Sequence, residues 1–257
     1  MEHQDEYTPE ILMVLETLWG AGFLSPGGEA HLDEIVKGLE LRDKLVLDVG
    51  SALGGFDILL AGKYGARVIG VDVEAALVEN GRRRVAAAGL SERIDLRLTV
   101  PGALRFPDAH FDVVFGKDSW IHIEDKRSFF AEVFRVLKPG GVLTAGDWLR
   151  SDRPYDRDME YFFKMEGLTY HMDTLENYGK FLETVGFVEV QLQDIYEEYR
   201  QMAREEYRRL QDELAPRLQE ALGPAGHAHF VEDWRSLVVV LDKGDLRPGR
   251  LRARKPG

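Results

Sequence analysis

Short apolar runs alternate with amphipathic segments through the first 145 or so positions of the chain. Residues 44–49, Lys-Leu-Val-Leu-Asp-Val, are almost continuously apolar and end at Gly50, a pattern typical of a strand buried on both faces. A glycine-rich turn and an amphipathic segment at 56–64 follow, and residues 66–71 are again short, apolar and β-branched. The sequence therefore predicts a strand, a helix and a second strand in succession.

The alternation continues along the chain. Further strands are predicted at 93–98, 111–115, 141–145 and 187–192. Helices are predicted at 9–19, 28–38, 74–88, 126–137 and 175–185. Strands that alternate with helices indicate an α/β fold with a parallel sheet covered on both faces.

The later part of the chain follows a different pattern. Residues 150–170 combine charges with aromatic residues without a clean period, which suggests an insertion on the substrate side. Residues 197–222 are rich in charge and contain Pro216, so we expect two helical pieces that meet near the proline and present a solvated face. The alternation from Arg250 to Arg254 predicts an edge strand whose arginines face solvent in preference to an anion.

Composition excludes several classes of function. The 257 residues carry 33 Lys and Arg against 45 Asp and Glu, a net charge of −12 that argues against a nucleic-acid partner. The chain has no Cys, so disulfides, thiolate metal sites and cysteine nucleophiles are excluded. The N-terminus is acidic and no apolar run approaches about 18 residues, so we expect a soluble, cytoplasmic protein without membrane contact. The oligomeric state stays open.

The first strand leads into a turn of small residues, Asp48-Val-Gly-Ser-Ala-Leu-Gly-Gly55. Small residues here let backbone approach a ligand closely, and the following helix offers unpaired N–H groups at its start. The spacing also fits the dinucleotide pattern G-x-A-x-x-G, and Asp72, after the second strand, is placed to accept hydrogen bonds from a ribose diol or to cap the next helix. A nicotinamide and an adenosyl cofactor both remain possible on these residues alone.

Four stretches of the chain resemble the class I S-adenosylmethionine-dependent methyltransferases. They are the turn at 47–55, the second-strand acid in 68–72, the Phe-Pro segment at 106–114 and Leu-Lys-Pro-Gly-Gly-Val-Leu at 137–143. Three more stretches, Tyr7-Thr8 with 23–28, Lys117-Asp-Ser-Trp-Ile-His-Ile123 and 243–249, resemble small-amine N-methyltransferases of the phosphoethanolamine and sarcosine/dimethylglycine types. The resemblance implies a doubly wound, mostly parallel seven-stranded sheet and an enzyme that methylates a small molecule.

The resemblance also implies where S-adenosylmethionine binds. The expected cofactor residues are Ser25, Asp48, Gly50, Ser51, Ala52, Gly54, Asp72, Val73, Pro101, Gly102 and Lys117. Members of the family usually place an acid against the adenine amino group, and here that position is Val100. Backbone near Pro101 and Gly102 is expected to replace it.

The expected catalytic residues are Asp118, His122 and Tyr7. Asp118 and His122 follow the fourth strand, where a doubly wound sheet presents ligand groups, and they would share a face if the loop formed a helix. In this reading His122 is the base or orienting residue and Asp118 holds the acceptor. The resemblance pairs Tyr7, in an N-terminal lid, with His122.

The expected acceptor-binding residues are Trp148, Tyr170 and Arg235, and no metal is required. Leu168 stands where the phosphoethanolamine enzymes would have an arginine, so the sequence favours a small amine and weakens the case for a phosphobase. The alternatives are a small-molecule O-methyltransferase, a non-catalytic subunit that binds an adenosyl ligand, and a nicotinamide oxidoreductase, which the segment at 137–141 disfavours. We expect a helical lid at 1–40 and a cofactor domain at 41–257 with substrate-side insertions at about 148–173 and 195–240.

Overall fold

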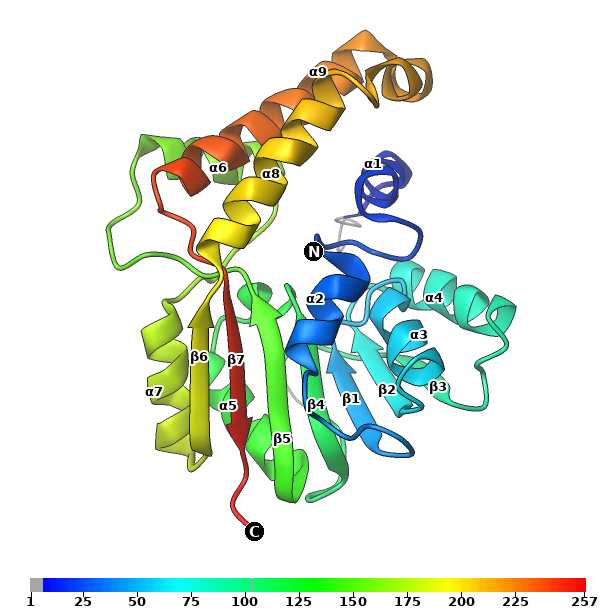
Figure 1. The fold of residues 1–257 in the computed structure, drawn as a ribbon, viewed down its shortest axis with the longest axis vertical. Coiled ribbons are helices and arrows are strands. Elements are labelled where there is room, and N and C mark those ends of the chain that lie inside the picture. Colours follow the sequence, from blue (N-terminus) through cyan, green and yellow to red (C-terminus); the bar gives the residue numbers. More distant parts are fainter. Residues whose placement is uncertain (1–6, 103) are drawn as a thin grey trace.

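The fold is built on one seven-stranded sheet, seen in a computed structural model that describes residues 7–102 and 104–257 (Figure 1). The strand order is β3-β2-β1-β4-β5-β7-β6, and every neighbouring pair from β3 to β5 is parallel. The bounds are β1 Leu45–Val49, β2 Arg67–Asp72, β3 Ile94–Leu98, β4 Phe111–Lys117, β5 Leu137–Asp147, β6 Val188–Asp194 and β7 Gly249–Arg254. The predicted doubly wound, mostly parallel sheet is confirmed.

Alternate residues of the central strands face two different hydrophobic layers. Val46 of β1 packs in the layer with α2 Gly28–Ile35, α3 Gly55–Gly62 and α4 Ala75–Ala87. Its neighbour Leu47 packs in the opposite layer, with α5 Lys126–Val136 and α7 Leu175–Val185. Because both faces are covered, the strands read as continuous apolar runs, which is why the sequence pattern identified them.

A third hydrophobic cluster lies beyond the carboxyl ends of the parallel strands (Figure 1). It joins α1 Pro9–Trp19, α6 Arg157–Glu166, α8 Tyr196–Gln211 and α9 Ala215–Asp242. We call it the helical cap. Of the two N-terminal helices, only α1 belongs to the cap, since α2 packs on the sheet. Residues 1–6 of the expected lid lie outside the described part of the chain.

The charged segment at 197–222 forms two helices, as predicted, and Pro216 stands in the first turn of the second. That second helix does not end near residue 222. Its direction breaks at Gly223, which has φ 73°, and it continues to Asp242. The resulting α8–α9 hairpin forms most of the cap (Figure 1).

The prediction that the C-terminal strand lies at an edge is wrong. β7 is antiparallel and lies between β5 and β6, with Leu251 opposite both Ala145 and Leu192. Arg250 is buried, and Arg252 donates to the carbonyl oxygens of Ile35 at 2.6 Å and Lys37 at 2.8 Å, whereas Arg254 is exposed. The edge strand is β6, whose side chains are mostly exposed.

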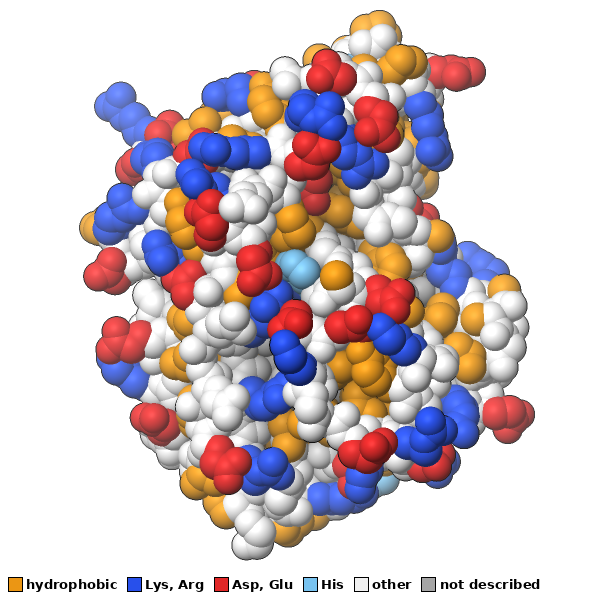
Figure 2. All heavy atoms as spheres, viewed as in Figure 1, with side chains coloured by type: hydrophobic (Ala, Val, Ile, Leu, Met, Phe, Trp, Pro, Cys, Tyr) orange, Lys and Arg blue, Asp and Glu red, His pale blue; other side chains and the backbone are white. Residues whose placement is uncertain are grey.

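Two surface properties complete the description. On the face shown in Figure 2, Lys and Arg side chains lie beside Asp and Glu side chains, so the charge is mixed. In residues 7–102 and 104–257, no helix is long and apolar enough to cross a membrane.

Candidate active site

The turn after β1 requires glycine at its first position. Gly50 has φ 91°, and a Cβ atom there would come within 2.2 Å of the Ser119 side chain. Ser119 is fixed by donating a hydrogen bond from Oγ to the Val49 carbonyl at 2.6 Å. Gly54, with φ 79°, directly precedes α3. The turn therefore brings bare backbone and the start of a helix to the carboxyl edge of the sheet.

Asp72 closes this turn from the neighbouring strand. One carboxylate oxygen accepts from the Ala52 N–H at 2.8 Å, and the other accepts from the Glu74 N–H at 3.0 Å. Burial raises the pKa of Asp72, and these backbone bonds act against that rise. The carboxylate thus supports the turn and the start of α4, and it is placed where the sequence analysis expects a ribose.

Asp48 lies behind the turn and is only 2% exposed. It faces Asp57 of α3, which is fully buried, and burial raises the pKa of Asp57 to about 7. Burial and the charge of Asp57 raise the pKa of Asp48 well above its usual range. Two buried acids therefore lie side by side beneath the turn, and the role of Asp48 in orienting the loop stays a prediction.

The other expected cofactor residues lie at the ends of the first three strands. Ser51 is buried in the turn, and Ala52 has a left-handed φ of 47°. Val73 follows β2 and is 38% exposed, while Pro101 and Gly102 form an exposed turn after β3. These positions form an open border beside Asp72.

Lys117 and Asp118 form a buried ion pair at the end of β4. Asp118 has a left-handed φ of 54°, unusual for a residue other than glycine. Tyr199 of α8 contacts both, with its hydroxyl 2.7 Å from Lys117 Nζ and 3.0 Å from Asp118 Oδ2. Lys117 Nζ also lies 3.4 Å from Ser25 Oγ. Lys117 and Ser25, expected at the cofactor, therefore lie in the network that holds Asp118.

His122 lies in a single 3-10 turn, Trp120–His122, so the loop does not form the helix that would place it and Asp118 on a shared face. Both side chains nevertheless line one cavity, together with Tyr7. The Nδ1 atom of His122 lies 2.9 Å from the Thr169 carbonyl oxygen, which can only accept, so Nδ1 carries a hydrogen and donates it.

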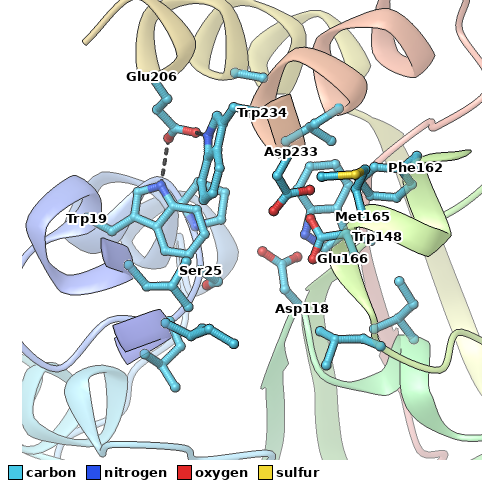
Figure 3. Close-up of a pocket in the computed structure, with 18 of the residues that line it drawn as sticks. Trp19, Ser25, Asp118, Trp148, Phe162, Met165, Glu166, Glu206, Asp233 and Trp234 are labelled. Carbon is cyan, nitrogen blue, oxygen red and sulfur yellow. Dashed lines mark hydrogen bonds between the residues drawn. The ribbon is translucent and has the colours of Figure 1, made fainter. Parts of the chain in front are cut away.

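The cavity lies between the sheet edge and the cap and has a volume of about 140 Å³ (Figure 3). Its wall combines aromatic rings with four carboxyl groups, and no Lys or Arg belongs to the described lining residues. The acids are Asp118, Glu166, Glu206 and Asp233. The aromatic residues are Tyr7, Trp19, Trp148, Phe162, Tyr170, Tyr199, Phe230 and Trp234.

Two of the three expected acceptor residues line this cavity. Trp148 packs edge-on against Tyr199 at 4.6 Å between ring centroids, and Tyr170 packs against His122 at 5.4 Å. Leu168, the position of the missing arginine, also lines it. Arg235 does not. Its guanidinium forms a half-exposed ion pair with Glu232, at 2.6 Å, outside the lining.

Glu206 joins three helices of the cap and was not predicted. Its carboxylate accepts from the indole N–H of Trp19 in α1 at 2.7 Å and of Trp234 in α9 at 3.0 Å (Figure 3). The sequence analysis interprets its segment as a solvated charged face. The spacing of Tyr199, Ala203, Glu206 and Leu210 was the available signal, because these residues form the buried stripe of α8.

Glu166 and Asp233 were also missed, since neither has a local motif. They come from α6 and α9, and only the packing of these helices brings them to one wall. In the part of the chain that the structure describes, no group of three or more side chains could hold a metal ion.

Comparison with known proteins shows which families the chain is similar to. Residues 47–145 match the family model described as a methyltransferase domain. Phosphoethanolamine N-methyltransferase 1 of Arabidopsis thaliana is 30% identical over 200 residues, which cover 77% of this chain and 40% of the relative. The phosphoethanolamine N-methyltransferase of Plasmodium falciparum is 28% identical over 202 residues, covering 77% of this chain and 74% of the relative. The chain thus spans less than half the length of the plant relative.

Solved structures share the fold. Phosphoethanolamine N-methyltransferase 2 of Haemonchus contortus, in complex with phosphomonomethylethanolamine and S-adenosylhomocysteine, has a TM-score of 0.91 at 22% identity, covering 99% of this chain and 59% of that one. A putative sarcosine dimethylglycine methyltransferase of Galdieria sulphuraria has a TM-score of 0.73 at 21% identity, and the match covers 85% of this chain and 81% of that one.

The sheet order, the glycine turn and the match of residues 47–145 to a methyltransferase domain agree with the resemblance to the class I S-adenosylmethionine-dependent methyltransferases, whose fold the chain shares. Within that class it is similar to the phosphoethanolamine N-methyltransferases, as the sequence resemblance indicated.

Proposed function

We propose that this chain is an N-methyltransferase that transfers a methyl group from S-adenosylmethionine to a small amine. The observation that carries the proposal is the cavity beside the glycine turn, with its aromatic wall, its four carboxyl groups and no Lys or Arg among the described lining residues. Carboxylates and aromatic faces both attract cations. An amine gains positive charge as it is methylated, so this lining stabilises the product charge as it develops.

The residues of the turn fit the adenosyl group of the cofactor. Gly50, Ser51, Ala52 and Gly54 provide close backbone approach, and Asp72 provides a carboxylate for the ribose. We place the adenine at the exposed border formed by Val73, Pro101 and Gly102. Backbone groups there would replace the acidic side chain that the family usually has at the position of Val100. The Haemonchus contortus relative was solved with S-adenosylmethionine as well, which supports the same choice here.

The cofactor supplies an electrophilic methyl group on a sulfonium. The chain's own residues hold the acceptor nitrogen in line and receive a proton from it. Nε2 of His122, the ring nitrogen that does not face the Thr169 carbonyl, is the acceptor for that proton. Asp118, fixed by Lys117 and Tyr199, orients the amine. Because the surrounding wall is largely apolar, water is kept from the reacting atoms and alignment supplies much of the rate.

Helix α1 and Tyr7 form the closing element in this proposal. Tyr7, Ile11, Leu15 and Trp19 all face the cavity from the N-terminal segment. If Tyr7 closes over the acceptor beside His122, Tyr7→Phe lowers kcat more than it weakens cofactor binding. Stopped-flow single-turnover rates and calorimetric affinities for S-adenosylhomocysteine measure the two quantities separately.

A methyl-transfer screen tests the whole proposal. Purified protein is incubated with S-adenosylmethionine and a panel of primary and secondary amines, phosphobases, phenols and hydroxylated acids, and the products are analysed by mass spectrometry. We expect N-methylated products, with unphosphorylated amines preferred over their phosphorylated counterparts. Methyl groups found only on oxygen or carbon would refute N-methylation, and a clear preference for phosphobases would refute the interpretation of the cavity charge.

A further inference from the structure

Two acidic side chains of the cap, Glu166 at the end of α6 and Asp233 in α9, line the cavity together with Asp118, and Asp233 points toward Asp118 (Figure 3). We call them the roof pair. Asp233 is only 7% exposed, and its Oδ1 atom has no hydrogen-bond partner among the described residues. A buried carboxylate oxygen without a partner is costly unless a ligand supplies one.

The electrostatics of the roof pair point to a cation. Burial and the charge of Glu166 raise the pKa of Asp233 to about 8, and burial raises the pKa of Glu166 to about 6. The hydroxyl of Tyr170 donates to Glu166 at 3.0 Å, which satisfies one oxygen of the pair. Among the described residues no Lys or Arg lines the cavity, so the imidazole rings of His122 and His229 are the basic side chains of its wall.

We propose that the roof pair binds a second, protonated nitrogen of the acceptor, so that the acceptor is a small diamine. This inference rests on the proposed N-methyltransferase function and deepens it. The nitrogen that takes the methyl group must be unprotonated to attack, whereas two carboxylates hold an ammonium group in its protonated form. The roof pair therefore suits the nitrogen that is not methylated, and the reacting nitrogen lies across the cavity near His122 and Asp118.

An ammonium group fits the roof better than a metal ion does. An ammonium group donates up to three hydrogen bonds, and the roof pair offers carboxylate oxygens that accept them. The aromatic rings of Trp148 and Phe162 lie close by and also attract a cation (Figure 3). A metal site would need further ligands, and the described residues contain no group of three or more that could hold an ion.

Acceptors of matched length test the inference. Wild-type enzyme is assayed with 1,4-diaminobutane and with butylamine, which differ only in the second amino group. We expect kcat/KM at least about tenfold higher for the diamine, mainly through KM. Asp233→Asn should lower kcat/KM for the diamine about ten- to hundredfold, the range for a hydrogen bond to a charged group, and should reduce the preference between the two amines.

Two further variants guard against misinterpretation. Glu166→Gln tests the second member of the pair and should reduce the same preference, and melting temperatures report whether either variant has lost stability. Glu232→Gln is the matched control, because Glu232 precedes Asp233 on α9 and pairs with Arg235 outside the cavity lining. We expect it to keep the wild-type preference.

A binding experiment separates failure of this inference from failure of the proposed function. Calorimetry follows 1,4-diaminobutane binding to enzyme saturated with S-adenosylhomocysteine, in two buffers of different ionisation enthalpy. At pH 7 the dication should displace a proton from the roof pair, and Asp233→Asn should reduce that release. The other titratable groups on this cavity are Tyr7, Asp118, His122, Tyr170, Tyr199, Glu206 and His229.

The outcomes are distinct. Diamine binding with proton release but without methyl transfer would support the roof pair and refute the proposed function. Methylation of both amines with equal kcat/KM, or an equal loss for both in Asp233→Asn, would overturn the inference and leave N-methylation standing.

Discussion

Replacement of Asp72 tests the most specific part of the cofactor site. Its two carboxylate oxygens accept from the backbone N–H groups of Ala52 and Glu74, and we propose that the same carboxylate binds a ribose diol. In Asp72→Asn the amide has one oxygen and one NH₂ group, so a donor must face one of the two backbone donors. The variant therefore loses the charge that faces the ribose and one support of the turn.

The magnitude follows from these bonds. Loss of a hydrogen bond to a charged group costs about 1.5–3 kcal/mol, which weakens binding of S-adenosylmethionine roughly 10- to 150-fold. The unsupported backbone N–H adds about 1–2 kcal/mol to the loss of folding stability. For a chain of 257 residues, that lowers the melting temperature by roughly 2–8 °C.

Isothermal calorimetry with S-adenosylmethionine and S-adenosylhomocysteine, together with thermal unfolding, measures both effects. Asp95→Asn is the control. Asp95 is an exposed acid on the neighbouring strand β3, and it forms a surface ion pair with Arg97 at 2.7 Å. A folded Asp72→Asn protein that binds both ligands within about threefold of wild type would refute the assignment of Asp72. Tight NAD binding by the wild type, with no response to either sulfur ligand, would refute the class of cofactor.

Three other expectations concern the base, the cap and pH. His122→Ala should lower kcat about 100-fold or more with little change in cofactor affinity, and recovery of kcat in His122→Asn would show that the ring is only structural. Glu206→Gln should lower folding stability by about 1–3 kcal/mol in denaturant unfolding, because its NH₂ group must face the indole N–H of Trp19 or Trp234. The folded-state pKa of Asp57, raised to about 7, means that the native state binds a proton more tightly than the unfolded state. Wild-type stability should therefore fall by up to about 4 kcal/mol as pH rises from about 4 to 7, and this decline should be smaller in Asp57→Asn; an unchanged decline would contradict the assignment.

Much of the cofactor half of the site could be predicted from the sequence, because its signals are local. The turn that contains Gly50 follows directly from an apolar strand, and Asp72 ends the next strand along the chain. Parallel strands place their carboxyl ends at one edge of the sheet, so succession in sequence predicts proximity in space. The same logic predicted Asp118 and His122 near one another, although through a helix that the structure does not contain.

The acceptor half could be predicted only in part. Trp148 and Tyr170 were identified through the resemblance, whereas Arg235, chosen to supply a positive charge, lies in an ion pair outside the cavity. Glu206 was interpreted as part of a solvated charged face, and Asp233 was not predicted at all. Whether a carboxylate on a helix is solvated or buried depends on which helix packs over it, and α8 and α9 pack against α1, whose sequence lies some two hundred positions away.

By itself the sequence determined the succession of strands and helices, the glycine turn and the acid that closes it, because apolar periodicity and backbone conformation act over a few residues. The tertiary structure alone decided that β7 inserts between β5 and β6, that Arg252 donates to the buried Ile35 carbonyl, and that four carboxyl groups meet in a cavity with no Lys or Arg among the described lining residues. Strand pairing, burial and the pKa of a carboxyl group all depend on neighbours that are distant in the chain, so their outcome is fixed only when the helical cap packs onto the edge of the sheet.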